Sequence, residues 1–279
     1  MKKWGNDASR LILGGHSFIQ QLGNDPAADE ELQIEIVRVC LDAGITTFDT
    51  TYQPERVALG RALSVLDRRD EATIVAWNFF KPFGPGDEVG GPAPYRPEHW
   101  QMLCRQLGTD HIEMLVLHSV GNPAEDAAQL EVAMAWQAEG KVDRLGIWAP
   151  PEDVQTRWPD GGPYALAVMR CNVAEPNTER FASAKAVGWE TLAVCPFGRG
   201  WELDKRAERF SALEGVDMET ARRRVAEAML RYSAFAPGVD RLIVAMRRTE
   251  WVLANLRYLH KGPLPAEETA WLKSLADAG

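Results

Sequence analysis

Short β-rich runs alternate with amphipathic helical stretches along the chain, and this alternation limits the possible folds more than any other feature. In the stretch before the second run, Leu32, Ile34, Val37 and Leu41 lie along one side of a predicted helix, which Gly44 ends. A strand followed by a helix, repeated eight times, predicts an α/β fold in which parallel strands close into a (β/α)8 barrel, the TIM barrel. The predicted strands are residues 11–15, 45–49, 73–77, 114–118, 144–148, 166–171, 191–195 and 241–245.

The length of the chain agrees with one barrel. Its 279 residues are close to the roughly 250 that an eightfold barrel needs, so we expect a single domain over residues 1–279. A doubly wound open sheet is the alternative, but no GxGxxG motif follows the first strand. One long stretch, residues 78–96, is rich in glycine, proline and aromatic residues and predicts an irregular loop. Such loops are uncommon unless they serve binding, and the alternative is a surface insertion.

Charge and composition exclude several classes of partner. The net charge is −9 and the acidic residues are scattered, so no basic stripe is present to bind nucleic acid. No apolar run is long enough to span a membrane and no apolar stretch follows the first lysines, which predicts a cytoplasmic protein without membrane contact. The four cysteines lack the CxxC spacing of metal sites, so no metal is expected. A small-molecule substrate is the expected partner, and the sequence carries no signature of an oligomeric state.

Several segments resemble those of the aldo-keto reductase family. Residues 44–63, GITTFDTTYQPERVALGRAL, resemble its signature of a strand ending in Asp-Thr-Ala, followed by a Tyr, a Glu and Leu-Gly. Residues 105–120, RQLGTDHIEMLVLHSV, and 139–148, EGKVDRLGIW, resemble its Leu-Gly-Thr-Asp, strand and His, and its later Glu-Gly-Lys and strand. CPFGRG at 195–200 and MRRTEWVLANL at 246–256 resemble its cofactor-binding segments. The resemblance covers nearly the whole chain and implies a TIM barrel of the aldo-keto reductase type.

The resemblance implies a catalytic site at the C-terminal ends of the strands. In the family a Tyr acts as the general acid, helped by a Lys, an Asp and a His. Asp49 matches the Asp and His118 the His, and we expect the two to face one another across the substrate. Tyr52 is the candidate acid, although it follows Asp49 by three positions where the family has five. Asn78 stands where the family has the Lys, and Lys81 is the nearest substitute.

The resemblance also implies NADPH across the end of the barrel, but the residues that would hold its nicotinamide differ. Trp148 and Ala149 stand where the family has Ser-Asn, Val168 where it has a Gln, and Val194 where it has a stacking Tyr. A buried carboxamide loses about 1–3 kcal/mol for each missing hydrogen bond. We therefore expect either no cofactor or weakly bound NADP(H).

The residues that would hold the phosphate and adenosine half of the cofactor are less altered. A Gly-Arg-Gly loop could wrap a pyrophosphate, and a helix start could hold an anion, although Ala245 replaces the family's Gly there. The alternative for the two arginines is a solvated helix start. The candidate cofactor-binding residues are Gly198, Arg199, Gly200, Arg247, Arg248 and Asn255.

Further candidates come from the residues alone. His16 follows two glycines at the end of the first strand, where an imidazole could move protons, and the alternative is a loop histidine with a structural partner. Arg170 shares the strand parity of Val168 and would pair with an anionic substrate group or form an ion pair at the rim.

Aromatic residues at two strand ends predict a substrate pocket. Trp77, next to Asn78, and Trp148 would form an apolar slot for a flat substrate. The alternative is that these indoles only fill the barrel.

Three functions remain open at this point. The first, which we prefer, is acid–base chemistry on a small carbonyl or hydroxy compound without hydride transfer, as in an isomerase, dehydratase or lyase, with Asp49, Tyr52, His118 and His16 as the catalytic groups. The second is an NADPH-dependent carbonyl oxidoreductase with an altered cofactor pose. The third is a non-catalytic binding protein on the same fold. The retained Asp49 and His118 count against the third, and the lost nicotinamide contacts count against the second.

Overall fold

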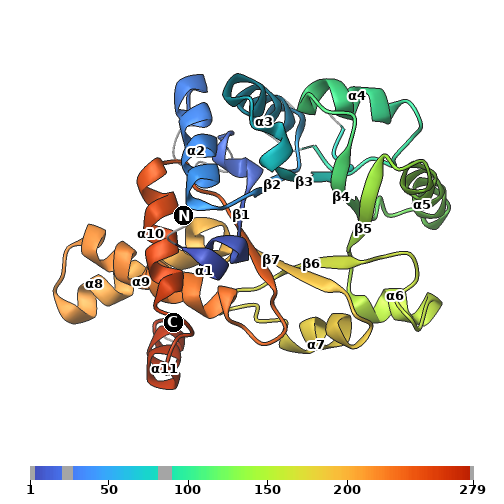
Figure 1. Ribbon diagram of the computed structural model, residues 1–279. Helices are drawn as coiled ribbons and strands as arrows, with labels where there is room; N and C mark the ends of the chain where they lie inside the picture. The colour runs from blue at the N-terminus through green and yellow to red at the C-terminus, as the bar shows by residue number, and fades with distance from the viewer. Residues whose placement is uncertain (1–3, 21–27, 81–89, 277–279) are drawn as a thin grey trace.

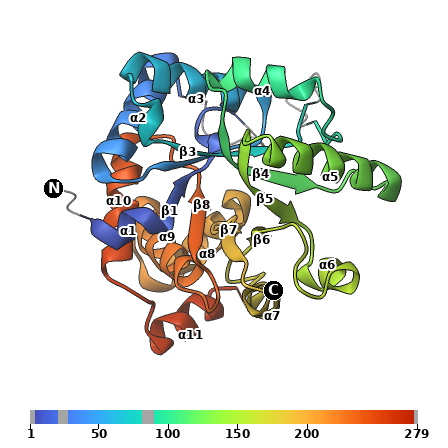
Figure 2. The same ribbon diagram turned by 45° about the vertical axis from the view of Figure 1, so that its right-hand side comes forward.

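The computed structural model, which describes residues 4–20, 28–80 and 90–276, contains a closed barrel of eight parallel strands (Figures 1 and 2). The strands follow one another around the barrel in chain order, and the first pairs with the eighth to close it. The predicted (β/α)8 fold is confirmed, and each strand end lies within two residues of its predicted position. The strands are β1 (Leu11–Leu13), β2 (Thr47–Thr50), β3 (Thr73–Trp77), β4 (Ile112–His118), β5 (Val142–Trp148), β6 (Leu166–Arg170), β7 (Glu190–Val194) and β8 (Arg241–Val244).

Helices lie outside the barrel between consecutive strands, and α8 and α9 pack against each other after β7 (Figure 1). The helices are α1 (Gly5–Arg10), α2 (Glu30–Ala43), α3 (Gln53–Leu66), α4 (His99–Leu107), α5 (Pro123–Ala138), α6 (Pro151–Arg157), α7 (Thr178–Ala186), α8 (Trp201–Glu214), α9 (Met218–Ala234), α10 (Thr249–His260) and α11 (Ala266–Ser274). The 3₁₀ turns are η1 (Gly15–Ser17), η2 (Arg69–Glu71) and η3 (Gly198–Gly200).

Local sequence signals set the helix ends. The side chains of Asp29, Asn122 and Asp217 accept hydrogen bonds from backbone N–H groups in the first turns of α2, α5 and α9. Gly44 ends α2 with a left-handed φ of 93°, as the sequence predicted. These caps fix where each connection leaves its helix and enters the next strand.

The interior of the barrel is filled by apolar side chains. Gly146 of β5 leaves no spare room, because a Cβ there would lie 2.4 Å from Cδ1 of Leu166. A packed interior confines any binding site to the ends of the strands. The interior residues are Ile12, Val75, Trp77, Met114, Val116, Leu166, Val168, Leu192 and Ile243.

The predicted loop at 78–96 connects β3 to α4. Residues 78–80 and 90–96 contain no helix or strand, and residues 81–89, which include Lys81, lie outside the described part of the chain. Near its end, Tyr95 is buried and its hydroxyl donates a hydrogen bond of 3.1 Å to the carbonyl of Val116 in β4. This side of the loop therefore packs against the barrel.

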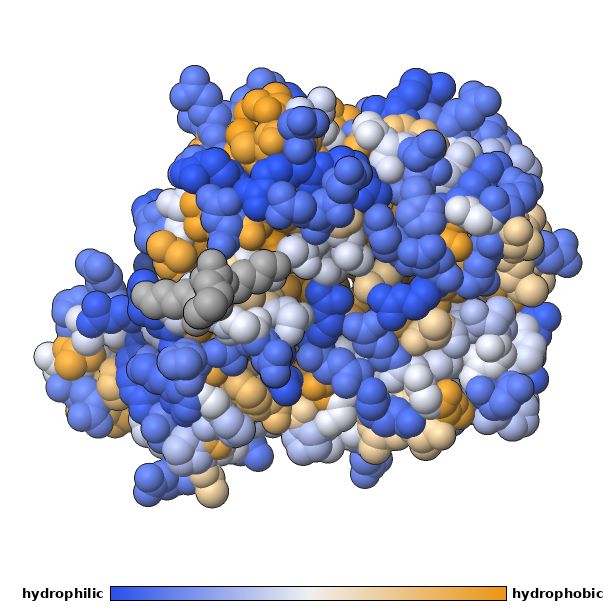
Figure 3. Space-filling model, viewed as in Figure 1, coloured by the Kyte–Doolittle hydropathy of each residue, from blue (hydrophilic) through white to orange (hydrophobic). Residues whose placement is uncertain are grey.

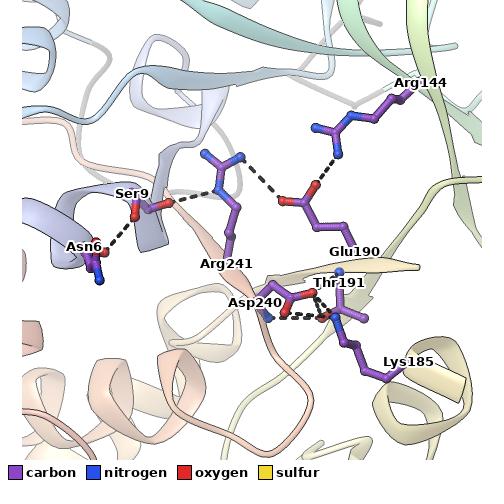
Figure 4. A network of polar contacts seen from close by, with 8 residues as sticks. All are labelled: Asn6, Ser9, Arg144, Lys185, Glu190, Thr191, Asp240 and Arg241. Atoms are coloured by element: carbon purple, nitrogen blue, oxygen red, sulfur yellow. Dashed lines mark hydrogen bonds and ion pairs between the residues drawn. The ribbon is translucent and has the colours of Figure 1, made fainter. Parts of the chain in front are cut away.

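Charged side chains pair with one another at the N-terminal end of the barrel (Figure 4). The carboxylate of Glu190 contacts Arg144 on one side and Arg241, at 3.6 Å, on the other. Lys185 lies 2.7 Å from Asp240, which also accepts a 2.8 Å hydrogen bond from the backbone N–H of Thr191. A hollow of about 760 Å³ is bordered by Lys185, Glu190, Asp240 and Arg241, whose charges already have partners.

The surface shown in Figure 3 is largely hydrophilic, with apolar residues scattered in small groups. Within residues 4–20, 28–80 and 90–276, no helix is both long and apolar enough to cross a membrane.

Candidate active site

The C-terminal ends of the strands, here called the mouth of the barrel, carry the predicted catalytic and pocket residues, most of them after β1 to β5. His16 lies in η1 directly after β1, and Asp49 lies in β2. Tyr52 immediately precedes α3, and its side chain is 8% exposed. His118 and Trp148 end the neighbouring strands β4 and β5 and are partners in their register. The barrel therefore brings together residues that are more than a hundred positions apart in the chain.

Asp49 is held by two hydrogen bonds in a nearly closed environment. Its Oδ1 accepts a 2.6 Å bond from Nε1 of Trp77, and the backbone N–H of Gly15 donates a second bond to the carboxylate. Burial and the nearby Glu55 carboxylate raise the pKa of Asp49 to about 7, although both hydrogen bonds and His16 act against this rise. Near neutral pH, Asp49 can therefore both accept and donate a proton.

Glu55, which sequence reasoning missed as a site residue, lies beside this carboxylate. Its side chain is fully buried in the first turn of α3. One oxygen, Oε2, accepts hydrogen bonds from the backbone N–H groups of Thr51, at 2.6 Å, and Tyr52, at 3.1 Å. The available signal was its third position in a predicted helix, where a Glu commonly bonds back to the chain that enters the helix.

His16 contacts the second oxygen of Glu55. Its Nδ1 lies 2.9 Å from Oε1 of Glu55. Burial and the nearby Arg247 lower the pKa of His16, whereas Glu55 and Asp49 raise it. The two carboxyl groups have the larger effect, so the pKa of His16 is raised. The chain comes very close here, since a Cβ on Gly15 would lie 2.3 Å from Oε2 of Glu55. Glycine is therefore required at position 15.

Asp49 and His118 bind different partners. In the described part of the chain no hydrogen bond or ion pair joins them, and the imidazole beside Asp49 is that of His16. His118 instead stacks on Trp148, with ring centroids 5.9 Å apart and an angle of 14° between the planes. Its Nδ1 lies 2.8 Å from the carbonyl oxygen of Ser119. Strand β3 lies between β2 and β4, and its Trp77 donates a hydrogen bond to the Asp49 carboxylate.

Tyr52 reaches the mouth despite the shortened spacing. Its ring centroid lies 5.7 Å from that of His16 and 5.3 Å from that of Phe79, which it meets edge to face. Phe79 in turn lies 5.5 Å from the ring of His118. The ring of Tyr52 is thus placed between His16 and the aromatic side of the mouth.

Trp148 points into the mouth. Its indole packs against the apolar interior of the barrel, and its centroid lies 5.7 Å from that of Trp77. Phe79 also packs against this interior. Trp77, Phe79, Trp148 and His118 therefore form an aromatic wall, which contacts Asp49 through Trp77 and Tyr52 through Phe79.

The structure corrects the prediction that Asn78 lines the pocket. Asn78 follows the inward Trp77, so its side chain leaves the strand on the other side, where it is fully buried. Its amide donates to the carbonyl of His118 and to Oε1 of Gln129, and its Oδ1 accepts from the N–H of His118. Asn78 ties β3 to β4 and offers nothing to a substrate.

Arg170 lies at the rim, at the end of β6. Its side chain is 40% exposed and its Nη1 lies 3.5 Å from Oε2 of Glu175. This matches the ion pair that the sequence analysis kept as the alternative to substrate binding.

The predicted phosphate-binding residues lie at the ends of β7 and β8. Gly198 and Gly200 form η3 with left-handed φ values of 53° and 93°, which glycine adopts without strain. Arg247 lies close enough to His16 to affect its pKa. Arg248 is exposed beside Trp251, and Asn255 is buried on α10. The side chain of Arg199 lies outside the described part.

The described residues contain no group of three or more histidine, cysteine or acidic side chains arranged to hold a metal ion. The described side chains of the mouth offer acids, imidazoles and a hydroxyl beside an aromatic wall.

Comparisons with known proteins agree with this architecture. The model of the aldo/keto reductase family matches residues 10–277. An aldo-keto reductase from Bacillus halodurans in its holo form is 20% identical with a TM-score of 0.73, covering 97% of this chain and 93% of its own. One from Klebsiella pneumoniae, in complex with NADPH, is 23% identical with a TM-score of 0.69, covering 95% and 90%.

A putative aldo-keto reductase from Pseudomonas aeruginosa is 18% identical with a TM-score of 0.66, covering 90% of this chain and 89% of its own. None of the curated proteins matches the chain. At these identities the solved structures show the fold alone, whereas the family model covers almost all of the sequence. The chain belongs to the aldo/keto reductase family.

Proposed function

We propose that this chain is an enzyme that moves protons on a small carbonyl or hydroxy compound at the mouth of the barrel, as an isomerase, dehydratase or lyase does, without the usual hydride transfer. The observation that carries the proposal is the pair of buried carboxyl groups of Asp49 and Glu55 with the partly exposed imidazole of His16, beside Tyr52. A carboxyl group with a pKa of about 7 is matched to proton transfer at neutral pH.

The roles follow from the positions of these groups. Asp49 takes a proton from the substrate and returns one to it, since its pKa lies near the working pH. His16 and the hydroxyl of Tyr52 interact with the substrate oxygen, and His118 approaches it from the aromatic wall. Trp77 and Trp148 hold a flat substrate against their faces.

The nicotinamide half of NADP(H) does not fit the residues at the mouth. The indole of Trp148 packs on the barrel interior and stacks on His118, and Val168 and Val194 add apolar surface on the neighbouring strands. Val168 and Val194 cannot hydrogen-bond a carboxamide, and the Trp148 indole carries one N–H donor and no acceptor for the carboxamide NH₂ group. We therefore expect NADP(H) to bind weakly or not at all, at a cost of about 1–3 kcal/mol for each missing hydrogen bond.

An NADPH-dependent carbonyl oxidoreductase with an altered cofactor pose is the second candidate. It is favoured by the family itself and by the Klebsiella pneumoniae relative, whose structure holds NADPH. The start of α10 after Arg248 has no side-chain cap, which leaves backbone N–H groups of its first turn available for phosphates. A non-catalytic binding protein is disfavoured, because it has no need of a carboxyl group with a pKa near 7.

Titration with NADPH and NADP⁺ separates the two candidates. We expect no dissociation constant tighter than about 100 μM, which corresponds to roughly −5.5 kcal/mol, and no rise in the thermal midpoint at low ligand concentration. A micromolar constant would overturn the proposal and favour the oxidoreductase.

An isotope-exchange assay tests the proposed chemistry directly. Small flat carbonyl and hydroxy compounds are incubated with the protein in deuterated buffer at neutral pH, and NMR follows the loss of C–H signals next to the oxygenated carbon. The wild-type protein should catalyse exchange in one class of compound and Asp49→Asn should not. Equal exchange by the two proteins, or none together with tight NADPH binding, would contradict the proposal.

A further inference from the structure

Asp49 and Glu55 place two carboxyl groups in one buried region, where other groups must offset the free-energy cost of negative charge. Their side chains are 5% and 0% exposed, and each raises the cost of charging the other. The pKa of Asp49 is raised to about 7, so this group remains neutral over a wider pH range and part of the cost is avoided. The remaining negative charge on Glu55 needs hydrogen-bond donors and a cation.

Glu55 has both kinds of partner. The backbone N–H groups of Thr51 and Tyr52 donate to Oε2, and Nδ1 of His16 lies 2.9 Å from Oε1. The carboxylate therefore joins the loop after β2, which carries Tyr52, to the turn after β1, which carries His16.

Arg56, the other cation near Glu55, is engaged elsewhere. It is fully buried, and its guanidinium donates to the carbonyls of Thr51, at 2.8 Å, and Phe79, at 3.1 Å, and to Oε1 of Gln106, at 2.6 Å. It holds the two loops that carry Tyr52 and Phe79. Among the described residues, His16 is the side-chain cation in direct contact with the Glu55 carboxylate.

The groups that face His16 favour its charged form. Glu55 from α3 and Asp49 from β2 stabilise the imidazolium, while burial and Arg247, which follows β8, oppose it. Tyr52 contacts the ring without charge. The balance is a raised pKa, which agrees with the ion pair seen in the geometry.

We propose that Glu55 is a positioning residue that holds His16 as an imidazolium at the mouth, where His16 supplies the positive charge beside Asp49 and Tyr52. Only the use of this charge in catalysis rests on the proposed function; the ion pair itself does not. A cation there stabilises negative charge that develops on a substrate oxygen or on the Tyr52 hydroxyl. Asn78, which stands where the family has the Lys, cannot supply this charge.

Histidine NMR titration tests the pair without any substrate. The protein, labelled with ¹⁵N-histidine, is titrated as wild type and as Glu55→Gln, which keeps an oxygen for the N–H groups of Thr51 and Tyr52 but removes the charge. His16→Gln assigns the signal. The pKa of His16 should lie above that of a free histidine in the wild type and fall below it in Glu55→Gln, because burial then acts with less opposition. His111, whose ion pair with Asp143 lies elsewhere, should titrate identically in both proteins.

A second measurement covers the case in which Glu55→Gln does not fold. In His16→Asn, the pKa of the Asp49 carboxyl, followed by ¹³C NMR, should rise above about 7, because a neighbouring positive charge has been removed. An unchanged His16 pKa in Glu55→Gln, or an unchanged Asp49 pKa in His16→Asn, would overturn the proposal.

The catalytic use of the charge has its own readout. In the isotope-exchange assay, Glu55→Gln should lower the rate at least tenfold and move the alkaline limb of its pH profile to lower pH, whereas loss of folding alone would lower the rate equally at every pH. If the assay detects no exchange in the wild type, the proposed function fails while the two titrations still decide the state of His16. If the titrations succeed but the profile does not move, the ion pair is structural and the proposed role of Glu55 in positioning a catalytic cation is wrong.

Discussion

The two ends of the barrel arrange their charged groups in opposite ways. At the N-terminal end, Glu190 lies between Arg144 and Arg241, and Asp240 pairs with Lys185 (Figure 4). At the mouth, by contrast, the carboxyl groups of Asp49 and Glu55 lie together, and the imidazole of His16 contacts Glu55.

Two aspartates show the consequence. Burial tends to raise the pKa of Asp240, but hydrogen bonds from Lys185 and Thr191 outweigh it and hold the pKa below its ordinary value. Burial and Glu55 raise the pKa of Asp49 to about 7. The N-terminal end therefore gains stability from its charges, and the mouth keeps a group that titrates near neutral pH. This division agrees with the usual placement of catalysis in such barrels.

The largest expected effect is on turnover, and it tests whether the raised pKa at the mouth serves chemistry. Asp49→Asn should lower the turnover of the substrate found by isotope exchange by about 10²–10⁴-fold, since a positioned acid–base group is lost. His118→Ala should also lower turnover, because its ring borders the same space. Thermal midpoints measured on the same samples separate loss of chemistry from loss of folding.

Asp240→Asn is the matched control at the other end of the barrel. It should leave turnover unchanged and lower the thermal midpoint, because the group pairs with Lys185 and lies far from the mouth. Full activity in Asp49→Asn would remove the functional distinction between the two ends.

The pH dependence of stability should carry the signature of Asp49. Its folded pKa of about 7 lies above its ordinary value of 3.8, so between these values the native state binds more protons than the unfolded state. Stability should therefore fall as the pH rises from about 4 to 7, by on the order of 4 kcal/mol, and the raised pKa of His16 acts in the same direction. Urea denaturation at a series of pH values measures this slope.

In Asp49→Asn the slope should become shallower. Asp240 has the opposite sign, because its lowered pKa gives stability that is lost only as the pH falls through that pKa in the acid range. A wild-type protein whose stability is constant between pH 5 and 7 would show that Asp49 does not titrate there.

At the N-terminal end, Glu190→Gln should cost about 2 kcal/mol of stability. The variant leaves Arg144 and Arg241 facing each other without the carboxylate that lies between them, and the Arg241 side chain is only 18% exposed. The cost is kept modest by the partial exposure of Arg144. Urea denaturation at neutral pH gives the value, and the isotope-exchange rate should not change.

A smaller effect is expected when the apolar filling of the mouth is reversed. Trp148→Ser combined with Ala149→Asn removes the indole that stacks on His118 and returns two hydrogen-bonding groups. NADPH binding should tighten about tenfold, or roughly 1.4 kcal/mol. Fluorescence titration measures it, with Trp201→Ser as a control, because that indole is exposed on α8 away from the barrel interior. No change in affinity would mean that Trp148 does not occupy the position of the nicotinamide.

The sequence predicted the strands and the family well because both depend on local patterns. Each strand is a short apolar run bounded by turn residues, and a side chain at the end of such a run must lie at the mouth once the barrel closes. That reasoning placed His16, Asp49 and Trp148 correctly at the mouth. Strand parity also explains why Asn78 was misplaced, since it follows Trp77, whose inward position sends the next side chain outward.

The partners of these residues were not predictable in the same way. Glu55 is identifiable as a helix-start residue, but its contact with His16 exists only because β1 lies next to β2 in the closed barrel. Asp49 and His118 also have partners that no pattern predicted, since Trp77 donates a hydrogen bond to the carboxylate of Asp49 and Trp148 stacks on the imidazole of His118. Long-range competition between side chains decides such contacts, and it leaves no periodic trace in the sequence.

The smallest expected effect concerns Arg170, which lies at the mouth but resembles the charges of the N-terminal end in having an ion-pair partner. Its side chain is 40% exposed, Glu175 is 52% exposed, and their closest atoms are 3.5 Å apart, so solvent screens most of the attraction. Arg170→Ala should therefore change stability by less than about 0.5 kcal/mol. The isotope-exchange rate and KM should also remain within about twofold of the wild type, because the guanidinium pairs with Glu175 rather than with the substrate. A large rise in KM without loss of stability would instead show that the ion pair opens to bind an anionic group of the substrate, and Arg170 would then belong with Asp49 and His16 as a functional residue of the mouth.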